Sequence, residues 1–416
     1  MKQLEKFSMG VGDRFGREGS VQLAAFIKAK AAGVEIAPVW NKSNREHQII
    51  HTAPPSVRVE ADAAVRAAGW KGSYHVDADH ISLKNVDGFI EASDFFTLDV
   101  ADFTGKPAEA DAIKAFAARH AHLAGALKIP GVTETYHITP HLIEKIAQKY
   151  LLAVQEAGKI YRHVAAQKGA ENFITEVSMD ETDAPQTPLE MLFILAAIAD
   201  EKIPAQTIAP KFTGRFNKGV DYVGDVAQFE KEFNDDLAVI EFAVHQFGLP
   251  DSLKLSVHSG SDKFSIYGPI HRALKRTGAG LHLKTAGTTW LEECAGLALA
   301  GGNGLILARE IYAGALARFD EMCGPYATVI DIHRHKLPPP AEVNAWTGAQ
   351  FAAALRHDQQ NPAYNPNLRQ LLHVGYKVAA EKGSTFIQAL DENRAHIANL
   401  VTDNLFEKHI RPLFLG

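Results

Sequence analysis

The stretch Ser73-Tyr-His-Val-Asp-Ala-Asp-His80 carries two histidines and two carboxylates at the end of a short run with strand character. A strand of a soluble protein does not need so many ionisable groups, so the stretch indicates a functional site at a strand end. Imidazole and carboxylate together are typical ligands of divalent metals. We therefore expect a β-strand here whose last residues do chemistry.

Along the rest of the chain, predicted strands alternate regularly with predicted helices. Short apolar runs alternate with longer segments at helical spacing, as in 227–247, where apolar residues recur every three or four positions. Eight such alternations favour an α/β fold, a (β/α)8 TIM barrel, with a doubly wound sheet as the alternative. The eight predicted strands are 7–11, 35–39, 73–76, 95–100, 173–177, 207–210, 254–257 and 281–284.

The segment after residue 302 does not continue the alternation. It reads as helices near 304–323, 341–356, 367–381 and 385–413, with a break at Pro338-Pro-Pro340. We therefore predict a catalytic barrel over 1–302 and a C-terminal helical extension over 303–416. The extension is expected to cover the barrel mouth or to build a homo-oligomer contact.

Composition excludes several classes of protein. The 416 residues are 46% hydrophobic and 22% charged, which allows a large core and excludes disorder. A net charge of −6 without a basic run argues against nucleic acid as a partner. No 18-residue apolar stretch indicates a membrane span, and the N-terminus lacks the apolar run of a signal peptide. With only two cysteines, the chain is expected in a reducing cytoplasm.

Ligand-type residues recur at the carboxyl ends of other predicted strands, where barrel enzymes place their active sites. His80, Glu176 and His258 come from three separate strands, so we predict that they hold a catalytic metal, either zinc, manganese, nickel or cobalt. Asp79, beside His80, is placed to move protons, and Asp77 should point the same way if the strand continues that far. Glu176 is a third candidate for the acid or base.

The turn Gly10-Val-Gly-Asp-Arg-Phe-Gly16 follows a strand and precedes a helix, as in a dinucleotide-binding turn. Its spacing departs from that fingerprint, and Asp13 would put a negative charge near a pyrophosphate. A nicotinamide-dependent sugar-acid oxidoreductase is nevertheless kept as an alternative function.

Four stretches resemble the tagaturonate epimerase family, whose members interconvert tagaturonate and fructuronate in bacterial hexuronate breakdown. They are 10–16, 76–80, 211–222 and 256–265. The Asp79-His80 pair and the turn 255–261 also resemble the class II ketose-bisphosphate aldolases, where an Asp-His pair gives a proton-transfer acid and a metal ligand. The chain departs from the aldolases at 209–214, which has no histidine where they have a further ligand.

The resemblance implies inversion of a carbon β to a ketone. Its C–H bond is not acidified by that carbonyl, so retro-aldol cleavage and re-addition, helped by a metal, is the expected route. A class II-type aldolase that releases the fragments is the runner-up. A sugar acid also needs cations for its carboxylate. The candidate substrate-binding residues are Arg14, Lys211, Arg215, Lys263, Lys284 and His282.

Overall fold

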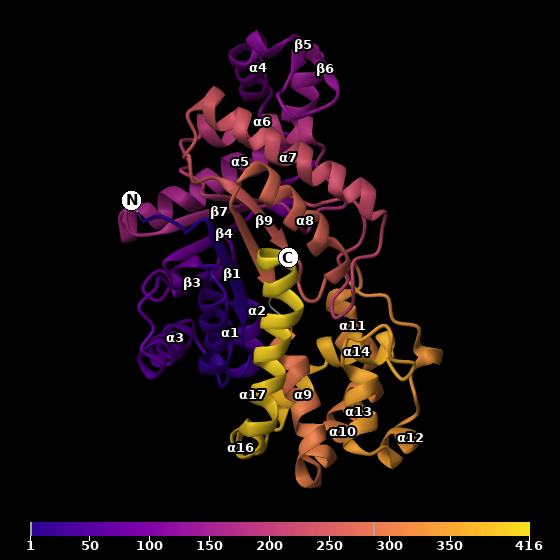
Figure 1. The fold of residues 1–416 in the computed structure, drawn as a ribbon. Helices are drawn as coiled ribbons and strands as arrows, with labels where there is room; N and C mark the ends of the chain where they lie inside the picture. The colour runs from indigo at the N-terminus through magenta and orange to yellow at the C-terminus, as the bar shows by residue number, and fades with distance from the viewer. Residues whose placement is uncertain (1, 286–287) are drawn as a thin grey trace.

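The eight predicted strands form a closed parallel barrel in the computed structural model, which describes residues 2–285 and 288–416. Around the barrel the order is β1-β10-β9-β8-β7-β4-β3-β2, so β1 pairs with both β2 and β10 and leaves no edge. The barrel strands labelled in Figure 1 lie together, with helices around them. The TIM-barrel prediction is confirmed. The strands are β1 (Phe7–Gly12), β2 (Ala37–Ser43), β3 (His75–Ile81), β4 (Phe95–Asp99), β7 (Ile174–Ser178), β8 (Thr207–Ala209), β9 (Lys254–His258) and β10 (Leu281–Thr285).

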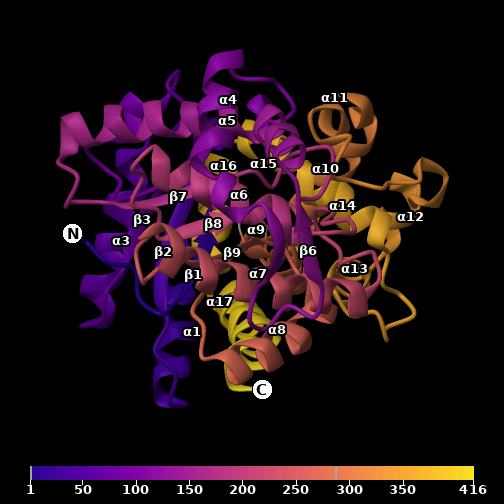
Figure 2. The same ribbon diagram turned by 90° about the horizontal axis from the view of Figure 1, so that it is seen from above.

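Helices surround the strands (Figure 2). Apolar side chains of the helices and strands pack together in one core. Two of them begin where a cap and a proline predict: the hydroxyls of Thr139 and Thr187 accept from the third N–H of α5 and α6, each with proline at the first position. The barrel helices and the short α2 are α1 (Gly19–Ala31), α2 (Asn44–Ile50), α3 (Pro55–Ala68), α5 (Pro140–Lys168), α6 (Pro188–Asp200), α7 (Val226–Phe247), α8 (Phe264–Thr277) and α9 (Thr288–Ala300).

An insertion between β4 and β7 departs from the predicted pattern. A helix predicted over 108–126 ends at Arg119 as α4 (Ala110–Arg119), and a hairpin of β5 (Gly125–Lys128) and β6 (Thr135–Ile138) follows. Figure 1 shows this insertion at the top, beyond α5 and α7. The hairpin was missed because its strands are short and mostly exposed, which leaves no apolar alternation to read.

Strand β3 runs five residues beyond its predicted end at Val76, and its last residues are irregular. The pairing register with β4 shifts between Ala78 and Ile81, and His80 has a φ of 53°. In a regular strand Asp79 and His80 would point to opposite faces. The bulge breaks that alternation, so both side chains reach the same cavity.

The C-terminal segment is helical, as predicted, and packs beside the barrel. The helices α10–α14 gather on one side in both views, and α17 lies along α1 and α9 (Figures 1 and 2). No helix in the described ranges is long and apolar enough to cross a membrane. The elements are α10 (Gly302–Ala317), α11 (Phe319–Cys323), η4 (Gly324–Tyr326), α12 (Pro340–Ala345), α13 (Gly348–Leu355), α14 (Pro366–Val374), α15 (Tyr376–Glu381), α16 (Ser384–Glu392), α17 (Arg394–Asp403) and η6 (Asn404–Leu415).

A buried ion cluster joins the extension to the loop after β9. Asp262 accepts from Arg369 at 2.7 Å and contacts His357 at 3.1 Å and His409 at 3.3 Å, and all four side chains are almost fully buried. The guanidinium of Arg369 also donates to the carbonyl oxygens of Gly219 and Leu355. One arginine therefore ties two barrel loops to the extension.

We expect Arg369→Met to lower the free energy of unfolding by about 3–5 kcal/mol, because it leaves the buried Asp262 carboxylate without its main counter-charge. The matched control is Lys28→Met, which breaks the exposed pair of Lys28 and Asp403 between α1 and α17 and should leave stability nearly unchanged. Urea unfolding followed by circular dichroism measures both. Equal midpoints for the two variants would show that the cluster does not anchor the extension.

Candidate functional site

A cavity of about 770 Å³ opens at the carboxyl ends of the barrel strands. Its wall combines barrel residues with residues of the extension, among them Tyr326, His373 and Tyr376. The lining is rich in charged side chains of both signs. A polar cavity at this end of the barrel is where a small charged substrate can meet catalytic groups.

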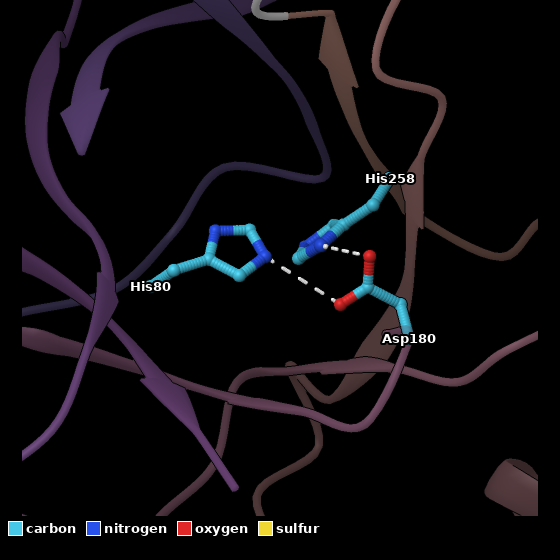
Figure 3. Close-up of side chains that lie close together, drawn as sticks. All are labelled: His80, Asp180 and His258. Atoms are coloured by element: carbon cyan, nitrogen blue, oxygen red, sulfur yellow. Dashed lines mark ion pairs between the residues drawn. The ribbon is translucent and has the colours of Figure 1, made fainter. Parts of the chain in front are cut away.

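His80, Asp180 and His258 come together in this cavity as a group that could hold a metal ion (Figure 3). Nε2 of His80 lies 3.5 Å from one carboxylate oxygen of Asp180, and Nδ1 of His258 lies 3.2 Å from the other. His80 comes from β3, His258 from β9, and Asp180 from the loop after β7. Two imidazoles and a carboxylate are a donor set that suits zinc and similar divalent metals.

The two ring nitrogens that face Asp180 fit a metal better than a hydrogen bond. Both Nε2 of His80 and Nδ1 of His258 are buried and make no hydrogen bond within the described residues. The opposite nitrogens are occupied: Nδ1 of His80 lies 2.6 Å from Asp79, and Nε2 of His258 lies 2.7 Å from Glu176. A carboxylate on the far nitrogen is how proteins orient metal-binding histidines.

Asp180, and not Glu176, is the carboxylate that lies with the two histidines in the candidate metal site. Glu176 was the predicted third ligand, but it lies inside β7, fully buried, and bonds His258, Thr97 and Thr207. Asp180, two residues beyond the end of the strand, is the carboxylate that reaches both histidines. Asp180 could have been found in the sequence as a carboxylate in the loop just after β7, whereas Glu176 lies within the strand.

The charges of the group favour a cation between the three side chains. Burial alone would lower the pKa of His258, but Asp180 above all raises that pKa to about 9. Burial opposes the charged form of Asp180, yet His258 and His80 together outweigh it and hold the pKa of Asp180 well below its usual range. Burial likewise works against His80, whose pKa Asp79 raises well above the ordinary value. The site therefore attracts positive charge, as protons or as a metal.

Lys284 lies deep in the site among three carboxylates. Its Nζ is 2.9 Å from Asp77, 2.9 Å from Asp79 and 3.3 Å from Glu176, and it donates to Thr97 at 2.7 Å. Burial alone would lower the pKa of Lys284, but the three carboxylates outweigh it and raise that pKa well above its ordinary value. The lysine stays charged and holds the acidic side chains in one place.

Asp77 and Asp79 point the same way, as the sequence predicts, but they differ in environment. Asp77 is fully buried, and burial raises its pKa to about 6. Asp79 lines the cavity, and although burial opposes its ionisation, Lys284 and His80 lower its pKa. The two bonds of Asp79 to His80 and Lys284 both use Oδ1, and within the described residues Oδ2 has no bond. Asp79 is thus an ionised carboxylate in the cavity wall with one oxygen not bonded by the described residues.

The other predicted substrate-binding residues divide between the cavity and the interior. Arg14, Lys211 and Arg215 line the cavity together with Lys284. Lys263 does not: its Nζ donates to backbone carbonyl oxygens, and burial lowers its pKa to about 7. His282 is fully buried against Ser8, and burial lowers its pKa to about 3. Asp180, Arg45 and Lys218 also line the cavity, and they were not among the candidates named from the sequence.

In the glycine turn after β1, the side chain of Asp13 already binds the backbone N–H groups that a phosphate would need. The carboxylate of Asp13 accepts the backbone N–H groups of Gly16 and Glu18 at the start of α1. A pyrophosphate would need these donors. The turn therefore serves as a barrel loop, which disfavours the nicotinamide alternative.

Comparison with known proteins gives one consistent family. The family model described as tagaturonate epimerase matches residues 1–413. The tagaturonate/fructuronate epimerase of Thermotoga maritima is 28% identical over 383 residues, which is 89% of this chain and 72% of that protein.

Solved structures agree with the fold. A glycerol complex of the fructuronate-tagaturonate epimerase UxaE from Cohnella laeviribosi matches with a TM-score of 0.81 and 24% identity. The native crystal structure of that protein matches with a TM-score of 0.79. Each match covers 99% of this chain and 82% of the solved one. The chain belongs to the tagaturonate epimerase family.

Proposed function

We propose that this protein interconverts D-tagaturonate and D-fructuronate, ketohexuronates that differ at the carbon β to the ketone. The observation that carries the proposal is the family match along nearly the whole chain. The cavity supports it, because it joins a His-Asp-His group with an ionised carboxylate and several cations. Such a cavity suits a substrate with a ketone, hydroxyl groups and a carboxylate.

The chemistry of the substrate favours cleavage of a carbon–carbon bond. The C–H bond at the inverted carbon is not acidified by the ketone, so simple deprotonation there is slow. A base can instead take the proton of the hydroxyl on that carbon. The bond to the carbon next to the ketone then breaks, its electron pair enters an enediolate, and the hydroxyl carbon becomes an aldehyde. The aldehyde group rotates so that its opposite face meets the enediolate. The reverse addition then forms the epimer.

Each step has a candidate group in the cavity. We propose that His80, Asp180 and His258 hold a divalent metal, which would polarise the ketone and stabilise negative charge on the enediolate. Asp79 is the proposed base, since it lines the cavity and His80 and Lys284 hold only its Oδ1, which leaves Oδ2 without a bond from the described residues. The positive charge of Lys284 keeps Asp79 ionised.

Carbon–carbon cleavage predicts the fate of a label at the inverted carbon. With deuterium on that carbon, we expect the epimer to keep the label completely, with at most a small secondary isotope effect. The reason is that retro-aldol cleavage does not break this C–H bond. Mass spectrometry and NMR of the product measure it, and added nicotinamide should change nothing.

Other routes give other products in the same experiment. An oxidative route breaks the C–H bond and shows a primary isotope effect, and a deprotonation route loses the label to water. Accumulation of three-carbon fragments without epimer would identify a lyase. Any of these results would overturn epimerisation by carbon–carbon cleavage.

A further inference from the structure

Among the described residues, six lysine and arginine side chains line the cavity, and four of them have hydrogen-bond or ion-pair partners. Arg14 pairs with Glu46 at 3.0 Å, and Arg215 lies 3.6 Å from Asp331. Lys211 donates to the carbonyl oxygen of Thr182, and Lys284 is held by three carboxylates. The charges of Arg14, Arg215 and Lys284 are thus balanced by carboxylates of the protein, whereas Lys211 is held by a neutral carbonyl oxygen.

Arg45 and Lys218 are the two cations of this group whose side chains have no such partner among the described residues. Within residues 2–285 and 288–416, neither side chain makes a hydrogen bond or an ion pair. Both lie beside one aromatic ring: the guanidinium of Arg45 and Nζ of Lys218 are each 5.6 Å from the ring centroid of Tyr326. Two cations that share a ring and lack an anion form an incomplete site, because like charges repel unless a counter-charge comes between them.

The three side chains come from separate elements whose backbones are fixed. Arg45 is near the start of α2, which a capping box of Ser43 and Glu46 holds in place. Lys218, in the loop after β8, donates its backbone N–H to Val329 of the extension at 2.8 Å. Helix α15 of the extension packs on α2. The incomplete site is therefore built by the fold and does not depend on one flexible loop.

Neighbouring aromatic rings continue this wall toward Arg14. The hydroxyl of Tyr326 lies 3.4 Å from that of Tyr376, and Arg14 stacks on the Tyr376 ring at 3.9 Å. All these residues line the same cavity as Asp79 and the His-Asp-His group. A ligand that fills the cavity from Arg45 and Lys218 to Asp79 needs an anionic group that binds the two cations. At its other end it needs a hydroxyketone that contacts Asp79 and the His-Asp-His group.

We propose that Arg45 and Lys218 bind the carboxylate end of the substrate against the ring of Tyr326. This inference rests on the proposed function and deepens it, since it names the groups that select a sugar acid over a neutral ketose. A planar guanidinium can bind a carboxylate through two parallel hydrogen bonds, and the lysine adds a second charge.

The first test separates binding from chemistry. In Arg45→Met and Lys218→Met, we expect KM for tagaturonate to rise about 10-fold or more, because a hydrogen bond to a charged group is lost, while kcat changes little. Arg45→Lys should recover part of the loss. The control is Arg334→Met, which removes an arginine stacked on Phe319 of the extension, outside the cavity lining, and should leave both constants unchanged.

The second test does not depend on epimerisation. Calorimetry with D-glycerate, glycerol and glycerol 3-phosphate compares a carboxylate, a neutral molecule and a phosphate on the same three-carbon skeleton. We expect D-glycerate to bind the wild-type protein and not Arg45→Met/Lys218→Met, and glycerol to show no difference between them.

The outcomes separate the two proposals. Unchanged KM in both single variants of an active epimerase overturns the carboxylate site alone. Glycerol 3-phosphate that binds in preference to D-glycerate, with the same dependence on Arg45 and Lys218, identifies a phosphate site and also overturns it. If the wild type binds D-glycerate through these residues but does not epimerise the uronates, the carboxylate site stands and the proposed function fails.

Discussion

Replacing His258 with alanine should remove the divalent metal from the protein and abolish epimerisation. The imidazole supplies one of three donors in the His80, Asp180 and His258 group, and the remaining two do not form a stable site. Loss of a carboxylate that only orients a histidine already weakens metal binding about 10–100-fold, so loss of a direct ligand should cost more. Elemental analysis of the purified variant, with turnover measured after metal is added back, checks this expectation. Full metal content in His258→Ala would contradict the assignment.

A matched pair of variants decides which carboxylate is the ligand. Asp180→Asn removes the charge that faces both histidines, whereas Glu176→Gln changes the group on the far nitrogen of His258. We expect Asp180→Asn to lose the metal and Glu176→Gln to keep it with weaker affinity. The reverse result would return Glu176, the ligand predicted from the sequence, to the metal. Titration with zinc or manganese after chelation gives both affinities.

Asp79→Asn should reduce turnover by about 10²-fold or more, even with the metal site saturated. The amide keeps the shape of the side chain and can still contact His80 and Lys284, but it cannot take a proton from the substrate hydroxyl. Because Asp79 also orients His80, metal affinity must be measured in the same variant, and turnover compared at full occupancy. Near-normal turnover at full occupancy would limit Asp79 to orienting His80.

Asp77→Asn is the matched control, since Asp77 contacts the same Lys284 but does not line the cavity. If Asp79 is the base, Asp77→Asn should lower turnover less than Asp79→Asn does. A larger loss in Asp77→Asn would make Asp77 the proton-transfer group. Circular dichroism of both variants ensures that the comparison is between folded proteins.

The sequence was informative wherever the signal is local. Apolar spacing and caps predicted all eight barrel strands and the long helices between them, though not the short α2, because each long element must bury one face whatever its neighbours are. The same reasoning predicted helices throughout the extension. The hairpin of β5 and β6 has short, exposed strands and so left no such signal.

The candidate site was predictable in part for the same reason. The carboxyl ends of parallel strands share one end of a barrel, so His80, Asp79 and His258 could be grouped from their positions alone. The positions in the sequence did not predict the bulge at His80. Because of this bulge, the side chains of two successive residues, Asp79 and His80, both point into the cavity. Nor could the positions separate Glu176, within β7, from Asp180, which lies in the loop beyond it.

What the sequence by itself determined is the set of elements and the end of the barrel at which the ionisable residues gather, since both follow from the periodicity of the chain. Only the tertiary structure decided which charges are balanced. Lys263 and His282 are buried among groups of the protein, whereas Arg45 and Lys218 reach the cavity without an anion. Pairing of charges depends on distances between residues far apart in the chain, and those distances are fixed only when the barrel closes and the extension packs against it.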